Sequence, residues 1–439
     1  MKKFKFLFIV LILSVILGAT FIVVDKCKEY DDFVPVLRFA IASDVHVADN
    51  GSEVEEKRLA SLFDIAYNYS RNNNTRYKKL DGVIFAGDFT NLGTLYSMQK
   101  FKDIVDNKIK PETKLVVSLG NHEFYSDASM AESRYKTVFK NEVDEHFILS
   151  GFHFIKLSPS GEYFSEAKLS WLRAELEKAS TDTPNKPIFV IQHQHVKNTV
   201  YGSTGWGADG LYEILSDYPQ VVDFSGHSHF PIQDERSLWQ GDFTAIGTGT
   251  VSYVEMGLNG VSTDYVFPDG RDGYYQLNSR TGNSDYGVFQ IVECDKNGNV
   301  RLIGYEISSG IRLFKRKIAT VNKDQFVTND TKKLITPIPE FETGSRCEFI
   351  KDGCDGGIIT IPQAKSDAFI ESYRIDLYHN DSLFNTYYAL SGQIFMPPPK
   401  SISIRLTGLE VGKSYFAKVY AVNAYGVAST MPIEFSIVF

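Results

Sequence analysis

Cysteine is scarce in this chain of 439 residues: there are four, and no two are spaced as a CxxC pair. A zinc site built from thiolates, which needs such pairs, is therefore not expected. Cys347 and Cys354 flank a short loop and would pair if their geometry allows it, whereas Cys294 lies in a strand-like run and is expected to be a buried thiol. So few cysteines fit an exported protein that depends little on disulfides.

The chain also lacks an excess of basic residues. Its 46 Lys and Arg stand against 54 Asp and Glu, which gives a formal net charge of −8. No basic stripe is present that could follow a phosphate backbone, so a nucleic-acid polymer is not expected as a partner. The 43% of hydrophobic residues is ordinary for a globular protein, and the 13% of aromatic residues favours a β-rich architecture.

A long apolar run, residues 6–24, follows Lys2, Lys3 and Lys5. A positive segment before an apolar stretch is typical of a secretory signal. The run also approaches the roughly 20 residues that span a bilayer. The sequence leaves open whether residues 1–30 are a cleaved signal peptide or a membrane anchor. In both cases the lysines stay inside, and the rest is expected in the periplasm, at the cell surface or secreted.

Strand-like runs alternate with helical patterns after this leader, which predicts an α/β fold rather than an all-β sandwich. Only strand signals remain in residues 346–439, and the polar, proline-bearing segment 331–345 suits a linker. We therefore expect a first domain at residues 33–330 and a second domain after the linker. The strands that matter are predicted at Val36–Ser43, Leu80–Ala86, Lys114–Leu119, Pro187–Gln192 and Gln220–Ser225, and helices at Glu53–Arg71, Leu95–Asn107, Met130–Asn141 and Lys168–Ala179.

Each of these five predicted strands ends in groups that can bind metals. Six of the nine histidines lie there, whereas His146, His153 and His379 lie elsewhere and are expected to be structural. Loops at the carboxyl ends of strands are the usual ligand sites of α/β sheets. An extended Asp-x-His or His-x-His points both side chains to the same side, and a glycine lets the backbone turn into the site. The groups are Asp44 and His46; Gly87 and Asp88; Gly120, Asn121, His122 and Glu123; His193 and His195; and Gly226, His227 and His229.

Imidazole, carboxylate and carboxamide groups form a mixed shell suited to Zn, Mn or Fe. A carboxylate such as Asp88 can bridge two cations. Two metals about 3.5–4 Å apart would activate a bridging hydroxide and stabilise the attacking and leaving oxygens at phosphorus. His122 follows Asn121 and, in an extended segment, would point away from the metal that Asn121 binds. It is therefore the candidate to protonate the leaving group.

In this order the motifs Asp-x-His, Gly-Asp, Gly-Asn-His-Glu, His and Gly-His-x-His resemble those of the calcineurin-like metallophosphoesterase superfamily, over roughly residues 37–307. The resemblance implies an α/β fold in which two mixed β-sheets pack face to face between flanking helices, in four layers. It also implies two transition metal ions. One would be held by Asp44, His46 and His229, the other by Asn121, His193 and His227, with Asp88 between them and His122 at the phosphate or the leaving group.

Two positions depart from the family's pattern. The family often has His-x-Pro at the fourth motif, and here His195 takes the place of the proline, as a substrate contact or a structural residue. The purple acid phosphatases place a tyrosine three residues after the bridging aspartate, and here that position is Asn91. Their tyrosinate-bound iron is therefore not expected. Glu123 stands beside the motifs either as a support for the ligands or as an ordinary turn residue.

The C-terminal segment resembles the end of a fibronectin type III domain. Tyr415, Ala417, Val419 and Ala421 alternate as in a half-buried strand, and Tyr415 is similar to the corner tyrosine of such sandwiches. The resemblance implies an all-β sandwich over residues 346–439. Its expected role is a spacer or support, with binding of a glycan or cell-surface partner as the alternative.

Together these features predict an exported phosphoesterase that acts on phosphomonoesters or phosphodiesters by in-line attack of the bridging hydroxide. Its substrates would be phosphorylated small molecules, lipids or proteins, and membrane attachment through residues 6–24 stays open. The alternatives are a non-catalytic surface or adhesion protein that reuses the fold, and metal-assisted hydrolysis of another bond.

Overall fold

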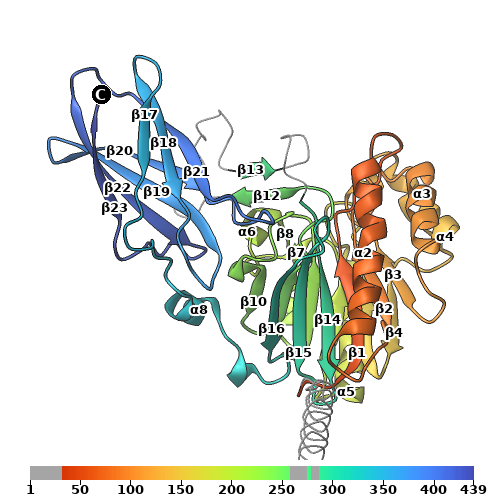
Figure 1. Ribbon diagram of the computed structural model, residues 1–439. Helices are drawn as coiled ribbons and strands as arrows, with labels where there is room; N and C mark the ends of the chain where they lie inside the picture. Colours follow the sequence, from red (N-terminus) through yellow and green to blue (C-terminus); the bar gives the residue numbers. More distant parts are fainter. Residues whose placement is uncertain (1–31, 258–273, 278–285) are drawn as a thin grey trace, which may run out of the picture.

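The computed structural model describes residues 32–257, 274–277 and 286–439 (Figure 1). The predicted leader, residues 1–30, lies outside the described residues. Within the described ranges, no helix combines the length and the apolar character that crossing a bilayer requires.

The first sheet of the N-terminal domain is mixed and has six strands. Strands β1, β2 and β3 run parallel, so their carboxyl ends meet at one edge, whereas β14 pairs antiparallel with β1. These three parallel strands lie within two residues of the predicted bounds. Across the sheet the order is β16 (Arg312–Ile318), β15 (Val300–Glu306), β14 (Val288–Asp295), β1 (Pro35–Ala42), β2 (Gly82–Ala86) and β3 (Lys114–Ser118).

The second sheet packs face to face against the first. Phe39 of β1 makes edge contacts with Phe154, Phe189 and Phe224 of the second sheet, at centroid distances of 5.3, 5.3 and 5.9 Å. All four rings are fully buried, and each such pair adds about 0.5–1.5 kcal/mol beyond its buried area. The strand order is β10 (Leu238–Gln240), β11 (Thr244–Gly247), β9 (Val221–Ser225), β6 (Ile188–Ile191), β5 (Phe152–Lys156) and β4 (Glu145–Leu149).

Helices cover both outer faces, which completes four layers and confirms the predicted fold class. Helices α2 (Glu53–Asn72), α3 (Leu95–Asp106) and α4 (Ala131–Phe139) pack on the first sheet (Figure 1), and α5 (Glu166–Asp182) and α7 (Tyr212–Leu215) pack on the second. The apolar residues of α2 follow the helical repeat and face the sheet. Hydroxyl caps begin two helices: Thr94 accepts from the backbone N–H of Ser97, and Ser165 from that of Lys168.

A short helix, α8 (Asn329–Ile335), occupies the start of the segment that was expected to be a linker. Thr328 caps it by accepting from the Thr331 N–H. The side chain of Lys332 is buried and donates to the carbonyl oxygen of Leu238. Helix α8 is therefore packed against the N-terminal domain.

The C-terminal domain is a sandwich of a three-stranded and a four-stranded antiparallel sheet, which confirms the predicted fibronectin type III-like architecture. The Tyr415 hydroxyl accepts from the Glu410 N–H at 2.9 Å, as a corner tyrosine does. Cys347 and Cys354 are both free, so the prediction that they pair is wrong: Cys347 packs against the sandwich core, and Cys354 is exposed. The sheets are β17 (Glu348–Lys351), β18 (Gly356–Pro362) and β21 (Ser401–Thr407), and β20 (Ser382–Leu390), β19 (Ile370–His379), β22 (Ser414–Asn423) and β23 (Ile433–Val438).

A buried interface joins the sandwich to the N-terminal domain. The Arg236 guanidinium ion-pairs with Asp234 of its own domain and, at 2.6 Å, with Glu371 of the sandwich. Both carboxylates are fully buried. An apolar cluster shared by the two domains, which includes Ile232 and Phe369, surrounds these charges. The sandwich is thus fixed near the residues that follow His229.

Candidate metal centre

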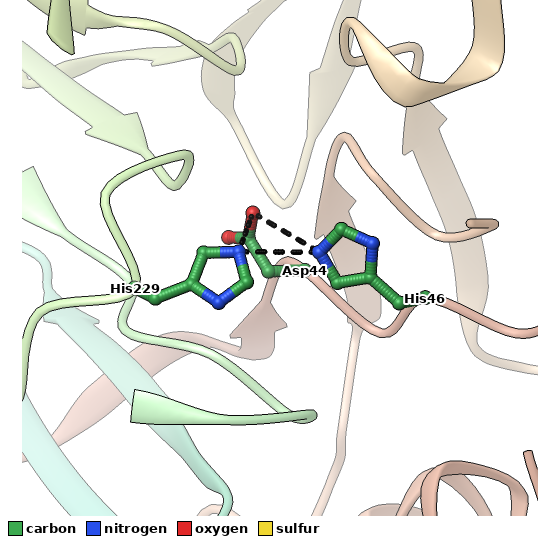
Figure 2. Close-up of side chains that lie close together, drawn as sticks. All are labelled: Asp44, His46 and His229. Carbon is green, nitrogen blue, oxygen red and sulfur yellow. Dashed lines mark hydrogen bonds and ion pairs between the residues drawn. The ribbon is translucent and has the colours of Figure 1, made fainter. Parts of the chain in front are cut away.

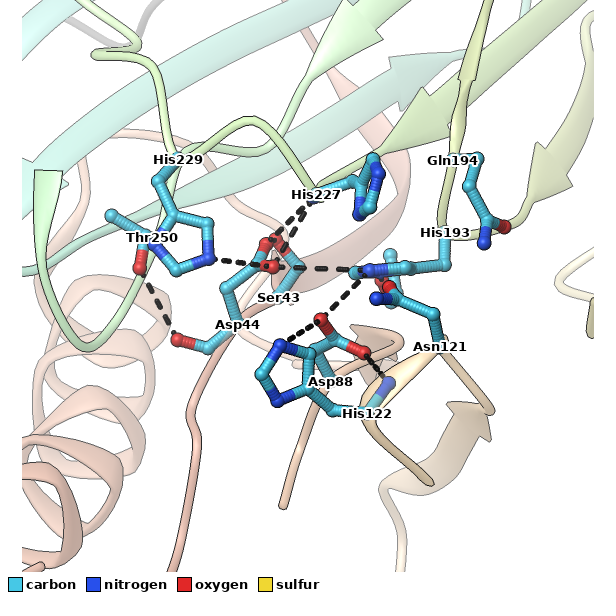
Figure 3. Close-up of polar contacts among 12 residues, drawn as sticks. Ser43, Asp44, Asp88, Asn121, His122, His193, Gln194, His227, His229 and Thr250 are labelled. Atoms are coloured by element: carbon cyan, nitrogen blue, oxygen red, sulfur yellow. Dashed lines mark hydrogen bonds and ion pairs between the residues drawn. The ribbon is translucent and has the colours of Figure 1, made fainter. Parts of the chain in front are cut away.

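The candidate ligands come together at the carboxyl ends of β1, β2, β3, β6 and β9 (Figure 3). Residues as far apart as 44 and 229 in the chain contribute to one cluster, as the motif order predicted. Three overlapping triads bring a nitrogen or oxygen of each member within 4.8 Å of the others. They are Asp44, His46 and His229; His46, Asp88 and His122; and Asp88, His193 and His227.

The first triad is compact (Figure 2). His229 Nε2 lies 3.1 Å from Asp44 Oδ1 and 3.1 Å from His46 Nε2, and His46 Nε2 lies 4.0 Å from Asp44 Oδ1. All three side chains are buried. One carboxylate oxygen and two imidazole nitrogens therefore face a common point, as the ligands of one cation would.

The second group centres on Asp88. Its Oδ2 lies 3.0 Å from His193 Nε2, and the rings of His193 and His227 have centroids 5.0 Å apart. Asp88 also belongs to the triad with His46, so it lies between the two groups, where a bridging carboxylate would be. The Asn121 amide donates to the Tyr125 hydroxyl at 2.7 Å. The buried Asn121 Oδ1 has no hydrogen-bond partner among the described residues, which leaves an acceptor for a cation.

Backbone carbonyls fix the tautomer of three histidines. His193 Nδ1 lies 2.9 Å from Ala86 O, His229 Nδ1 lies 2.9 Å from Tyr253 O, and His122 Nδ1 lies 2.7 Å from Asn91 O. A carbonyl oxygen only accepts, so Nδ1 must carry the hydrogen in each ring. Nε2 is then the nitrogen that faces the centre, which is the usual arrangement for a histidine that binds metal.

The ligand backbones are not the regular extended segments that the Asp-x-His and His-x-His patterns suggested. Asp44, His46, Asp88, His227 and His229 have positive φ values between 49° and 72°. Residues other than glycine rarely adopt this left-handed conformation, which costs of order 1–3 kcal/mol and concentrates at functional sites. The side chains thus converge because the backbone turns at these five ligands.

The three motif glycines serve different purposes. Gly87 has a φ of +81°, the left-handed turn that the sequence predicted. At Gly120 and Gly226 the need is space instead, because a Cβ would clash with the carboxylate of Asp88 and of Asp44, respectively. Close approach of the backbone to a ligand is a reason for glycine that motif spacing alone does not distinguish from a turn.

The protonation states suit cation binding. Burial raises the pKa of Asp44, but the imidazoles of His229 and His193 outweigh it and lower that pKa to about 2. The pKa of Asp88 is lowered as well, because His193 outweighs burial. Burial lowers the pKa of His46 to about 3, whereas Asp88 raises that of His193 to about 10 against burial. The carboxylates are thus ionised and His46 is neutral at pH 7, and a cation would displace the proton of His193.

Glu123 is the support that the sequence left undecided. Its buried carboxylate accepts from the N–H groups of Asp88, Thr90 and Gly120 at 3.1, 2.9 and 2.7 Å. It thereby ties the loop after β2 to the loop after β3. Burial and the Asp88 charge raise the pKa of Glu123 to about 8, against the lowering effect of these hydrogen bonds.

His122 does not lie in the extended segment that was expected. It begins a 3-10 helix, η1 (His122–Phe124), and its Nε2 still reaches to 3.8 Å from Asp88 Oδ2. The backbone N–H of His122 donates to the other Asp88 oxygen at 2.9 Å. The side chain is 23% exposed. The His122 side chain is therefore partly open to a substrate.

His195 is buried, and serine hydroxyls contact both of its nitrogens, Ser225 at 2.8 Å and Ser228 at 2.7 Å. This geometry favours the structural alternative over a substrate contact. His146 and His153 contact each other and the carboxylates of α5, as structural histidines do.

Comparisons with known proteins agree with this geometry. A family model described as calcineurin-like phosphoesterase matches residues 37–231. No curated protein matches the chain. Among solved structures, a purple acid phosphatase from yellow lupin (Lupinus luteus) seeds is 13% identical over 64% of this chain, with a TM-score of 0.45. The match covers 53% of that protein, so the chain spans about half its length.

A further structural match falls on fibronectin domains. The FN1–FN3 domains of chicken CNTN1 are 12% identical over 38% of this chain and 46% of theirs, with a TM-score of 0.19. The fold, the clustered ligands and the family match point to the same part of the chain. Residues 37–231 match the calcineurin-like phosphoesterase model, and all the candidate ligands, from Asp44 to His229, lie within them.

Proposed function

We propose that the protein is a dinuclear metallophosphoesterase that hydrolyses phosphomonoesters or phosphodiesters outside the cytoplasm. The observation that carries the proposal is the pair of ligand groups that meet at Asp88, with the buried Asn121 Oδ1 left as a free acceptor. Asp44, His46 and His229 would hold one cation. Asn121, His193 and His227 would hold the other, with Asp88 shared between them.

The chain's own residues have distinct tasks in the reaction. When bound, the two Mn, Fe or Zn ions supply Lewis-acid chemistry that acidifies water and neutralises the phosphoryl oxygens. The His122 Nδ1–H donates to Asn91 O, so Nε2 is the nitrogen that can hold a proton for the leaving oxygen. The Asp88 carboxylate accepts from the backbone N–H of His122 and so keeps this residue beside the reacting group.

Export is the part of the proposal that rests on sequence alone. Three lysines precede the apolar residues 6–24, which is the pattern of a signal peptide or anchor. The substrates are then phosphorylated small molecules, lipids or proteins that the chain meets outside the cytoplasm. Fusion of residues 1–31 to a reporter that is active only after export tests this part. A reporter that stays inside would contradict it.

Metal analysis and hydrolysis together test the catalytic part. About two transition metal ions per chain and turnover of p-nitrophenyl phosphate or its bis ester are expected for the metal-loaded protein. His122→Gln should lose most of the activity and keep the bound metal. His379→Gln, at a half-buried sandwich histidine that contacts Ser414 O, is the matched control. A metal-free protein without turnover after reconstitution would instead support a surface protein that reuses the fold.

A further inference from the structure

Two exposed aromatic rings flank the candidate metal centre. The Tyr125 ring lies 4.4 Å from the His122 ring, centroid to centroid, and Tyr125 is 51% exposed. The Trp206 ring meets that of His227 edge-on at 5.6 Å, and Trp206 is 42% exposed. Large apolar rings beside a polar site that stay open to water are typical of ligand contacts.

Support of the histidines does not by itself explain this exposure. Tyr253 also packs on two of the histidines, at 4.2 Å from His229 and 5.9 Å from His46, and it is largely sheltered. A ring that only orients a ligand can therefore be covered in this fold. Tyr125 and Trp206 present free surface that a substrate can cover.

Tyr125 is placed at the leaving-group side of the centre. It stands next to His122, the residue proposed to give a proton to the leaving oxygen. Its hydroxyl is held by Asn121 at 2.7 Å, which fixes the ring. The ester group of a bound substrate begins at the leaving oxygen, so this group is the part that meets the Tyr125 ring.

Trp206 follows a segment of the chain that is anchored to the rest of the structure. It ends the short helix α6 (Ser203–Trp206), which follows Tyr201 and Gly202. The Tyr201 ring packs on Phe230 at 4.1 Å, and the Arg236 guanidinium lies over it at 3.6 Å. Arg236 in turn ion-pairs with Glu371 of the sandwich. The segment that leads into the Trp206 helix is thereby held in place, which limits the ordering that ligand binding would add.

The charge near Tyr125 restricts the ester group further. The Glu162 carboxylate lies 3.4 Å from the Tyr125 hydroxyl. A leaving group with additional phosphates would meet this negative charge, whereas an uncharged ring would not. The surroundings of Tyr125 thus favour a neutral aromatic group over a polyphosphorylated one.

We propose that Tyr125 and Trp206 form an aromatic subsite that selects phosphoesters with an uncharged aromatic ester group. The inference rests on the proposed function, because the subsite is defined relative to the reacting phosphorus. An aryl group and a nucleobase both present a planar aromatic face, so either could be the ester group that this subsite binds.

Binding of unreactive phosphonates tests the subsite without turnover. Metal-loaded full-length protein should bind phenylphosphonate on the order of fivefold more tightly than methylphosphonate, since an aromatic contact is worth about 1 kcal/mol. Tyr125→Ala and Trp206→Ala should each remove most of this difference. Tyr125→Phe, which keeps the ring, should retain it. Phe416→Ala is the control, at a sandwich ring that is 37% exposed.

A kinetic arm separates the two sources of the ring. The kcat/KM ratios of phenyl phosphate and of a nucleoside monophosphate to glycerol phosphate are compared between wild type and Tyr125→Ala, so that intrinsic reactivity cancels. A fall in the phenyl ratio assigns an aryl ester to the subsite, and a fall in the nucleotide ratio assigns a nucleobase.

The outcomes separate the subsite from the proposed function. Equal affinity of the wild type for the two phosphonates would overturn the subsite, even with ester hydrolysis intact. Preferential binding of phenylphosphonate without hydrolysis of any ester would retain the subsite and overturn the proposed function.

Discussion

Two clusters of buried charge lie on the same strand, β1, and they are compensated in opposite ways. Arg38, in the first half of β1, pairs across the sheet with Glu293 of β14, which pairs in turn with Arg301 of β15. The Glu293 oxygens accept from Arg38 Nε and Arg301 Nε at 2.7 Å each. All three side chains are at most 1% exposed. This cluster is closed, because cations and anion are both supplied by the chain.

The metal centre, just past the end of β1, has the opposite design. The carboxylates of Asp44 and Asp88 face imidazole nitrogens whose other nitrogen is already committed to a backbone carbonyl, as in His193 and His229. Asn121 adds a buried oxygen without a hydrogen-bond partner in the described part of the chain. Without a cation, a proton on His193 must join its imidazole to Asp88, whereas the Asn121 oxygen has no donor among the described residues, which is costly in a buried site.

The difference separates structural from functional burial of charge. A closed cluster stabilises the fold and leaves no capacity for a ligand. An open cluster lowers the stability of the metal-free fold and holds its ligands on strained backbone. Binding of cations offsets this loss of stability. Substitutions in the two clusters should therefore have opposite consequences for activity and for stability.

The largest expected effect is on activity, from Asp88→Asn. The amide keeps the shape of the shared carboxylate but removes the charge between the two cations. Activity should fall on the order of 10³-fold or more, since metal neutralisation of the phosphoryl group is worth several kcal/mol. Turnover of p-nitrophenyl phosphate measures this. The urea midpoint of the metal-free protein should change little, and an active Asp88→Asn enzyme would contradict the bridging role.

Removal of the anion from the closed cluster should have the reverse effect. Glu293→Gln leaves the guanidinium groups of Arg38 and Arg301 buried without a counter-charge, which costs about 3–5 kcal/mol of unfolding free energy. Urea denaturation measures the loss. Glu434→Gln is the control, because its exposed pair with Lys418 should contribute at most about 1 kcal/mol. Equal stability of the two variants would remove the distinction between the clusters.

Sequence reasoning located the open cluster and missed the closed one. The ligands of the centre follow apolar strands in a fixed order of short motifs, and the resemblance of this order to a known family predicted that Asp44, Asp88 and His227 meet. Arg38 and Glu293 are 255 residues apart and lie inside strands, where no local sequence pattern predicts the partner of a charged residue. Only the pairing of β1 with β14 brings them together.

The details of the site depended on tertiary contacts in the same way. The order of motifs could not show that Glu123 ties two loops together, because its partners lie 3 to 35 residues away. Nor could it show that His195 is enclosed by two serines. A disulfide between Cys347 and Cys354 was compatible with their spacing, but the sandwich buries one thiol and exposes the other.

A smaller effect is expected from Glu123→Gln, which tests whether the open cluster needs its support. The amide NH2 cannot accept from the N–H groups that now point at a carboxylate oxygen, so the loops after β2 and β3 should lose their common anchor. Changes of residues that hold metal ligands typically cost 10–100-fold in metal affinity or activity. Metal titration of the purified variant measures this, with Glu434→Gln as the control. A wild-type metal affinity of Glu123→Gln would show that the two loops keep their positions without this carboxylate.

The smallest effect is a change in the pH dependence of stability, from a carboxyl below the centre. Asp223 of β9 is buried and accepts from Gln192 Nε2 at 3.2 Å. Burial raises its pKa to about 7, although hydrogen bonds from Gln192 and Ser225 oppose this. An unfolded aspartate titrates near ~3.9, so between these values the folded state binds more protons than the unfolded state.

The free energy of unfolding that Asp223 contributes must therefore fall as the pH rises from about 4 to about 7, and it stays low above that range. Asp223→Asn cannot ionise, so the chelated variant should lose about 1 kcal/mol less stability than the chelated wild type between pH 5 and pH 6. Urea unfolding at the two pH values measures the difference. Glu293 has guanidinium partners, whereas Asp223 has only hydrogen bonds. If the stability did not depend on pH in this range, hydrogen bonds alone would stabilise a buried carboxylate as well as a guanidinium does. That result would weaken the distinction between the two clusters at its physical root.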